Sequence, residues 1–168
     1  MEFKTYIEAV CGPTSARSAQ IDLWGAIEDL DTSGVTSMSG AFNDQSSHCQ
    51  NPDISLWDVS TVSDMDAMFE DAEFFNQDLS AWDVSTVINM AHMFERATAF
   101  NQDLSAWNLQ AVRSMRRMFD GATSFTGDGL NGWDMSSCIL DVDSCSEHMF
   151  SNSPSPCVMT EGVGITGC

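Results

Sequence analysis

Apolar positions recur along this chain with a period of about 25 residues. The blocks Trp57–Ala81 and Trp82–Ala106 share 18 of 25 residues without a gap. Weaker copies begin at Leu30, at Trp107 and, one residue late, at Trp133. A repeat of this length is typical of units that stack on one another, because a single unit cannot bury its apolar face. The pattern therefore predicts about five stacked units.

Each repeat divides into two halves. In the spacing Leu79-x-x-Trp82-x-Val84, apolar residues alternate with polar ones, which is typical of a short strand with one buried face. The next apolar residues are spaced by 3, 4 and 3, which is typical of a helix; they are Val87, Met90, Phe94 and Ala97. We therefore predict an α/β fold, a short leucine-rich-repeat-like solenoid with one short strand and one helix per 25-residue repeat.

The repeated motif W-D-V-S-x-V-x-x-M-x-x-M-F-x-x-A-x-x-F-N-x-D-L-S resembles the BspA-like leucine-rich-repeat family, a mycoplasma-type domain of unknown function. The resemblance covers roughly Trp24 to Phe150. It implies a leading helix at Phe3–Cys11 that closes one end of the array. It also implies surface-exposed binding and adhesion, with no catalysis.

The chain, 1–168, is predicted to form a single domain, with an N-terminal helical cap (1–23), about five repeats (24–150) and a disulfide-stapled C-terminal cap (151–168). Cysteines lie only near the two ends, which favours disulfides in an oxidising compartment. The six are Cys11, Cys49, Cys138, Cys145, Cys157 and Cys168. Although six cysteines allow 15 pairings, we favour 11–49, 138–145 and 157–168, because each of these pairs is local.

The chain is strongly acidic, with 25 Asp and Glu against 6 Lys and Arg, for a formal net charge of −19. This charge excludes ordinary binding to a nucleic-acid backbone, which requires clustered basic residues. It also disfavours docking on an anionic lipid surface. No apolar run is long enough to span a bilayer, and the N-terminus lacks a signal-peptide pattern. We expect an extracellular or cell-surface location, or an organelle lumen.

Polar positions of the predicted strands form a candidate binding face. In stacked units they would form two columns: Asp58, Asp83, Asn108 and Asp134, beside Ser60, Ser85, Gln110 and Ser136. Neighbouring strands lie about 4.8 Å apart, and carboxylates at that distance repel each other even in water. Three explanations stay open: an Asp/Ser hydrogen-bond ladder, a basic protein partner, or Ca²⁺. Calcium needs six to eight oxygens around one point, which a single column does not supply.

A second candidate is a basic docking patch of Arg113, Arg116 and Arg117 on one exposed helix face, with a solvated, salt-linked face as the alternative. The M-x-x-M pairs favour core packing over a Cu(I) site, and the aligned Trp residues favour core packing over a sugar-binding platform. Asn76 and Asn101, in equivalent turns, are interpreted as an internal amide ladder.

Catalysis is not expected, because the sequence contains no nucleophile-elbow, P-loop or dinucleotide-binding motif. The segment Cys138-x₆-Cys145-x₂-His148 has a weak likeness to a zinc site, against which we favour a disulfide loop. No cofactor is predicted. The leading function is a non-catalytic protein-interaction module for adhesion, recognition or scaffolding, with a partner of basic or mixed surface. The alternative is a soluble accessory subunit of a larger membrane-associated complex, possibly organelle-lumenal or photosynthetic; a calcium-dependent module is more distant.

Overall fold

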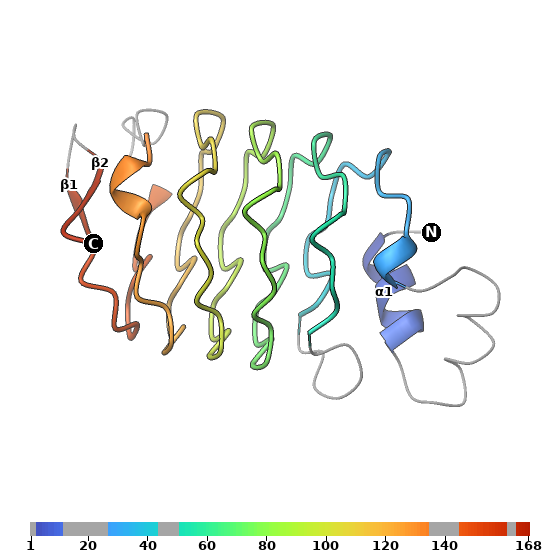
Figure 1. Cartoon of the computed structure of the whole chain (residues 1–168), viewed down its shortest axis with the longest axis horizontal. Coiled ribbons are helices and arrows are strands. Elements are labelled where there is room, and N and C mark those ends of the chain that lie inside the picture. The colour runs from blue at the N-terminus through green and yellow to red at the C-terminus, as the bar shows by residue number, and fades with distance from the viewer. Residues whose placement is uncertain (1–2, 12–26, 44–50, 135–144, 161–163) are drawn as a thin grey trace.

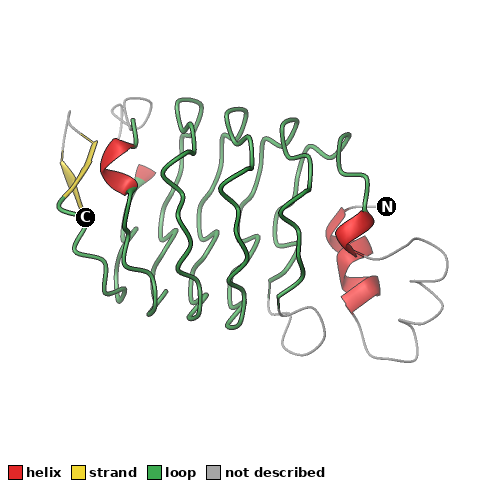
Figure 2. Cartoon of the chain, viewed as in Figure 1, coloured by secondary structure: helices red, strands yellow, loops and turns green. Residues whose placement is uncertain are grey.

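The computed structural model describes residues 3–11, 27–43, 51–134, 145–160 and 164–168. The repeats form coils that lie side by side, with a helix at one end of the stack and a small hairpin at the other (Figure 1). The helix is α1 (Phe3–Cys11). The hairpin pairs β1 (Val158–Thr160) with β2 (Gly164–Thr166) in antiparallel register. The described residues also contain two short 3₁₀ turns, η1 (Ile27–Asp29) and η2 (Leu130–Gly132) (Figure 2).

The predicted α/β fold, a leucine-rich-repeat-like solenoid with one strand and one helix per repeat, is wrong. The described repeats consist of turns and extended segments joined by isolated parallel bridges. Each segment predicted to be helical contains residues in the left-handed region, such as Ala67, His92 and Arg117 with φ values of 54°, 57° and 53°. A right-handed helix requires φ near −63° throughout, so these residues exclude it.

Hydrogen bonds between coils take the place of the expected helix. The amides of Met65, Ala67 and Phe69 donate over 2.8–2.9 Å to carbonyls of the next coil, at residues 89, 91 and 93. In a helix these amides would donate to the carbonyl four residues earlier in their own segment. The intervening amides instead close short turns, as from Met68 to the carbonyl of Met65. The same ladder links five successive coils, from residues 38–42 to residues 145–151.

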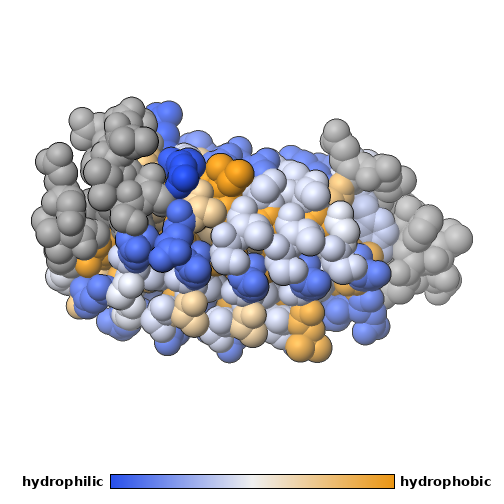
Figure 3. Space-filling view, turned by 90° about the horizontal axis from the view of Figure 1, so that it is seen from above, coloured by the Kyte–Doolittle hydropathy of each residue, from blue (hydrophilic) through white to orange (hydrophobic). Residues whose placement is uncertain are grey.

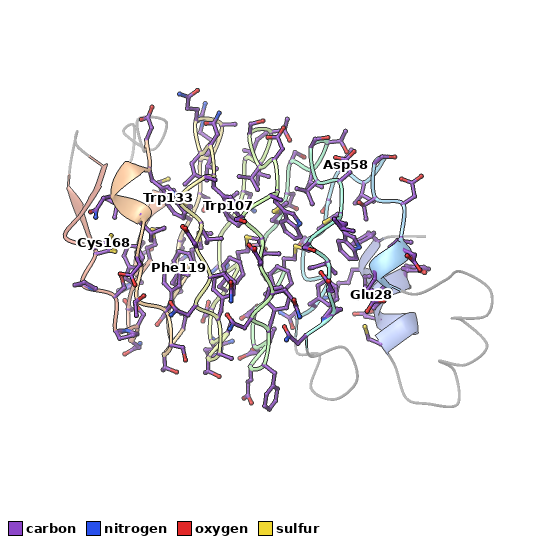
Figure 4. The ribbon with its side chains drawn as sticks, viewed as in Figure 1. Glu28, Asp58, Trp107, Phe119, Trp133 and Cys168 are labelled. Carbon is purple, nitrogen blue, oxygen red and sulfur yellow. A yellow bond between two sulfur atoms is a disulfide. The ribbon has the colours of Figure 1, made fainter. Side chains whose placement is uncertain are left out.

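The core consists of columns of identical side chains, as the repeat predicted. Phe42, Phe69, Phe94, Phe119 and Phe150 stack with ring centroids 5.4–5.7 Å apart. The methionines of the M-x-x-M pairs are fully buried, which confirms their interpretation as core. The four Trp residues that align between repeats are buried too, and each indole N–H donates to a carbonyl of the preceding coil over 2.9–3.1 Å; they are Trp57, Trp82, Trp107 and Trp133. Trp107, Trp133 and Phe119 lie inside the stack in Figure 4.

Both ends of the stack are covered. At the first coil, Phe3 of α1 meets Trp57 edge to face at 5.5 Å, and Ile7 is fully buried. The helix at Phe3–Cys11 is therefore confirmed. At the other end a disulfide joins Cys157 to Cys168, which confirms that predicted pair.

The other two predicted disulfides are only partly within the described residues. Cys11 and Cys145 are both disulfide-bonded. Cys49 and Cys138 lie outside the described residues, so the pairs 11–49 and 138–145 stay predictions.

Candidate functional site

A column of exposed carboxylates runs along one edge of the stack, where each coil turns. We name it the Asp58 column; it comprises Asp31, Asp58, Asp83, Asn108 and Asp134. Figure 4 places Asp58 near the upper edge of the coils, and the view from above shows hydrophilic residues in a row along the stack (Figure 3). The structure therefore brings together the predicted acidic column. Ser136, which was predicted to extend its serine neighbours, lies outside the described residues.

The carboxylates of Asp31, Asp58 and Asp83 are each fixed by the residue two positions later. Asp58 Oδ1 accepts hydrogen bonds from the Ser60 amide at 3.0 Å and from the Ser60 hydroxyl at 2.6 Å. Asp83 Oδ1 accepts from the Ser85 amide at 3.1 Å. The fourth coil has the same geometry without charge, because Asn108 Oδ1 accepts from the Gln110 amide, also at 3.1 Å. These are Asx turns, in which a short polar side chain takes the place of a backbone acceptor.

The column stays ionised despite its crowding. The hydroxyl and the amide of Ser60 lower the pKa of Asp58, while the negative charge of Asp31 opposes that shift. Ser85 lowers the pKa of Asp83 in the same way, against the repulsion of Asp58. Hydrogen bonds to the charged form thus outweigh the like-charge repulsion. The hydrogen-bonded ladder that was one of three open explanations is present.

The sequence reasoning missed a second acidic column five residues earlier in each repeat. The Asp78 column, as we name it, comprises Asp53, Asp78 and Asp103, all exposed. Their Oδ1 atoms accept hydrogen bonds from the amides of residues 55, 80 and 105 at 2.9–3.2 Å. The signal was available, because Asp-x-Ser occurs twice in each of the two best-conserved repeats. The interpretation of these turns as an amide ladder rested on Asn76 and Asn101 alone and did not extend to the neighbouring Asp residues.

The amide ladder that was predicted next to this second column is confirmed. Asn76 Oδ1 accepts from the Asn101 amide at 2.9 Å, and Asn101 Oδ1 accepts from the Thr126 amide at 3.0 Å. Asn51 begins the ladder by accepting from the Asn76 amide at 2.9 Å. These side chains satisfy backbone donors at each turn, so their role is structural.

The three arginines of the predicted docking patch do not share a helix face, because no helix is present there. Arg116 pairs with Glu147 at 3.1 Å rather than with Asp120. Arg117 lies 3.7 Å from Glu95 and 3.9 Å from Asp120. Arg113 turns back onto nearby backbone carbonyls at 3.3–3.5 Å. Each arginine therefore has its own partners within the chain, and a docking role for them stays a prediction.

An ion-pair cluster that the sequence did not predict surrounds Arg96. Its guanidinium lies 2.7 Å from Asp71 and 2.8 Å from Glu70, and it also contacts Glu95. Glu95 is only 4% exposed, and a buried carboxylate requires a partner of this kind. The hydrogen bond between Arg96 and Asp71 raises the pKa of Arg96 and lowers the pKa of Asp71. The cluster links neighbouring coils and is a structural clamp.

Metal chemistry finds little support in the described part of the chain. No group of three or more His, Cys, Asp or Glu residues there is placed to hold a metal ion. The zinc interpretation of Cys138-x₆-Cys145-x₂-His148 is wrong, because Cys145 is disulfide-bonded and is not available as a thiolate ligand. His92 faces Asp66, with 3.2 Å between Nδ1 and Oδ1.

Stacked coils with aligned core columns and two exposed acidic columns define a repeat protein. Residues 15–133 match the family described as Mycoplasma protein of unknown function, DUF285, and the chain belongs to that family. No curated protein and no solved structure matches it. In the described residues, no helix combines the length and the apolar character that a membrane span requires. The disulfide at the C-terminal hairpin is compatible with an extracellular location.

Proposed function

We propose that this protein is a non-catalytic binding module that takes a basic protein surface along the Asp58 column. The supporting observation is a row of ionised carboxylates held in fixed positions. One oxygen of each is used in its Asx turn, and in the described structure the Oδ2 atoms of Asp31, Asp58 and Asp83 accept no hydrogen bond. These outward acceptors are preorganised for Lys or Arg side chains of a partner.

Rigid spacing makes the column more than a diffuse negative charge. The ladder between coils and the stacked rings fix the distance from one carboxylate to the next. Complementary charge of this kind contributes mainly to association rate and to the choice of partner. The resemblance of the repeats to BspA-like proteins, together with the disulfide, supports adhesion or recognition at a surface in an oxidising compartment. An accessory subunit of a larger complex is the competing context for the same surface.

Charge removal without structural change tests the proposal. Asp58→Asn with Asp83→Asn removes two charges and retains the Asx turn, since Asn108 makes the same hydrogen bond naturally. The matched control, Asp53→Asn with Asp78→Asn, removes the same charge from the other column. The immobilised protein is exposed to an extract of its source in moderate salt, and each captured partner is then purified and titrated. We expect about tenfold weaker binding for the first pair and little change for the control. Equal losses of affinity for the two double variants would attribute the effect to net charge alone. No loss for Asp58→Asn with Asp83→Asn would reject the Asp58 column as the binding surface.

The size of the native protein in the same extract separates the two contexts. Migration with a large assembly under mild detergent supports an accessory subunit. Migration near 18.4 kDa, the mass of the chain, supports a free recognition module.

A further inference from the structure

A groove of about 730 Å³ lies between α1 and the first coil. Phe3, Leu30 and Val35 give it an apolar wall, and Asp31 lies at its border. The segment from Gly34 to Ser37, together with Ser39, forms the side that belongs to the coil. Lys4, the basic residue of the wall, lies 4.0 Å from Glu8 of its own helix. The groove therefore combines apolar surface, a carboxylate and exposed backbone.

The backbone in this groove is an open edge of the ladder. Between the first and second coils, the amides of Met38 and Gly40 donate to the carbonyls of Asp64 and Asp66, at 2.9 and 2.8 Å. The amide of Ser63 donates in the opposite direction, to the carbonyl of Thr36 at 2.9 Å. Every interior coil thus presents one donor and at least two acceptors to the coil before it.

Among the residues that the structure describes, no coil precedes the first one. Its equivalent groups are the amide of Thr36 and the carbonyls of Ser37 and Ser39, and within the described residues none of the three has a hydrogen-bond partner. Thr36 and Ser37 are exposed, and Ser39 is half-buried. By contrast, Ala41, the next residue along the edge, is fully buried. The accessible edge therefore extends over Thr36–Ser39 and accommodates a short segment rather than a whole coil.

We propose that this groove binds an extended segment of a partner protein, which adds to the edge of the first coil and sets a basic side chain against Asp31. Two amides of the segment, two residues apart, donate to the carbonyls of Ser37 and Ser39, while a carbonyl of the segment accepts from the Thr36 amide. Unpaired edges are templates for such strand addition. Alternate side chains of the segment pack on Phe3, Leu30 and Val35. The inference shares with the proposed function Asp31, the first member of the Asp58 column, and the premise that the protein binds other proteins; the two are separated by Gly34→Trp and by the Asp58→Asn and Asp83→Asn protein.

Charge supports a basic rather than an acidic occupant. Asp31 Oδ1 is fixed by the Ser33 amide at 3.1 Å and by its hydroxyl at 2.7 Å, so the carboxylate keeps its position at the border of the groove. The molecule as a whole carries a formal charge of −19. An acidic segment would be repelled during approach and would have no partner at Asp31.

Two glycines provide a matched pair of variants. A Cβ atom added at Gly34 has no atom within 4 Å, and the same is true of Gly132. Both residues are exposed, and neither has a positive φ. Gly34→Trp therefore introduces a bulky ring at the wall of the groove without strain, while Gly132→Trp introduces the same ring in η2, at the other end of the stack.

The experiment selects random short peptides displayed on phage against the wild-type protein and titrates the enriched peptides by fluorescence polarisation. We expect the enriched peptides to carry a basic residue among alternating apolar ones. They should bind Gly132→Trp as tightly as wild type. They should bind Gly34→Trp and Asp31→Asn at least about tenfold more weakly. N-methylation of two amides two residues apart should abolish binding, while methylation of the amide between them should not.

Failure of this inference is distinguishable from failure of the proposed function. The groove proposal is overturned if the peptides bind Gly34→Trp as tightly as wild type. It is also overturned if no peptide is enriched. If the enriched peptides instead lose affinity only for the Asp58→Asn and Asp83→Asn protein, the groove is rejected while the Asp58 column is supported. Equal weakening by the two Trp variants attributes the effect to the added ring and likewise rejects the groove.

Discussion

Replacing Ala67 with glycine should stabilise this protein, although the same change in a helix would destabilise it. Ala67 has φ 54°, in the left-handed region where a Cβ atom crowds the following carbonyl. Gly40 occupies the equivalent position of the first coil with φ 59°. Glycine adopts this conformation without steric strain, so Ala67→Gly removes a local penalty that the inter-coil hydrogen bonds now offset.

The expected magnitude is the difference between two terms. Relief of left-handed strain is worth about 1–2 kcal/mol, and the greater freedom of glycine in the unfolded chain costs about 0.4–1 kcal/mol. The net effect lies between about 0 and 1.6 kcal/mol, with a gain of about 0.8 kcal/mol at the centre of the two ranges. In an exposed helix interior the same substitution would cost about 0.8–1.0 kcal/mol. The two structures of this segment thus predict effects of opposite sign.

Urea denaturation followed by Trp fluorescence measures this effect. The midpoint should rise while the slope stays constant, since the surface exposed on unfolding does not change. Ala106→Gly is the control, because Ala106 is exposed and has no positive φ; it should lose about 0.4–1 kcal/mol. If Ala67→Gly is destabilised as much as Ala106→Gly, the left-handed turn, and with it the ladder between coils, is refuted.

Three further predictions concern the core, a glycine and the acidic columns. Trp82→Ala should lose about 3–5 kcal/mol in denaturation, and Trp82→Phe about 0.5–1.5 kcal/mol because the Ile54 carbonyl loses the indole donor at 3.1 Å but keeps the Trp57 amide; an unchanged melting temperature for Trp82→Ala would contradict the buried column. Gly121→Ala should lower stability by about 1–2 kcal/mol, since its φ is 73° and a Cβ would lie 3.1 Å from Arg96 Cγ; wild-type stability would contradict that conformation. Because the folded-state pKa values of Asp58, Asp78 and Asp83 are lowered, their stabilisation is complete above about pH 4 and is lost as the pH falls below it; melting temperatures that already decline between pH 7 and pH 5 would contradict this assignment.

The sequence predicts the core of this protein better than its backbone. The spacing of Val87, Met90, Phe94 and Ala97 correctly indicates four buried residues. It does not indicate a helix, because successive turns also return side chains to the same side every three or four residues. A helix and a series of turns differ in the acceptors of their backbone amides. The Met90 amide, for example, donates to the Ser114 carbonyl of the next coil. That bond depends on the neighbouring repeat and leaves no local signal.

The left-handed residues carry little signal in the sequence that would distinguish these turns from a helix. Glycine and asparagine commonly mark such positions, yet His92, Arg96 and Arg117 occupy them here. Gly40, Gly121 and Asn152 carry the expected residue types. For the candidate site, the Asp58 column followed from the period alone, because identical residues one repeat apart must lie side by side. The groove could not be predicted from the period, since it depends on how α1 packs against the first coil.

The ladder also separates the length of the repeat from the register of the stack. Met65 donates to a carbonyl 24 residues ahead, whereas Met115 donates to one 30 residues ahead, at Cys145, with a similar bond. Six additional residues are therefore accommodated without disturbing the ladder on either side. An individual coil can thus be lengthened, or a whole coil added to the stack, while the ladder between coils keeps its register. The stacking of the coils is therefore set by the hydrogen-bond ladder and not by the number of residues in each repeat.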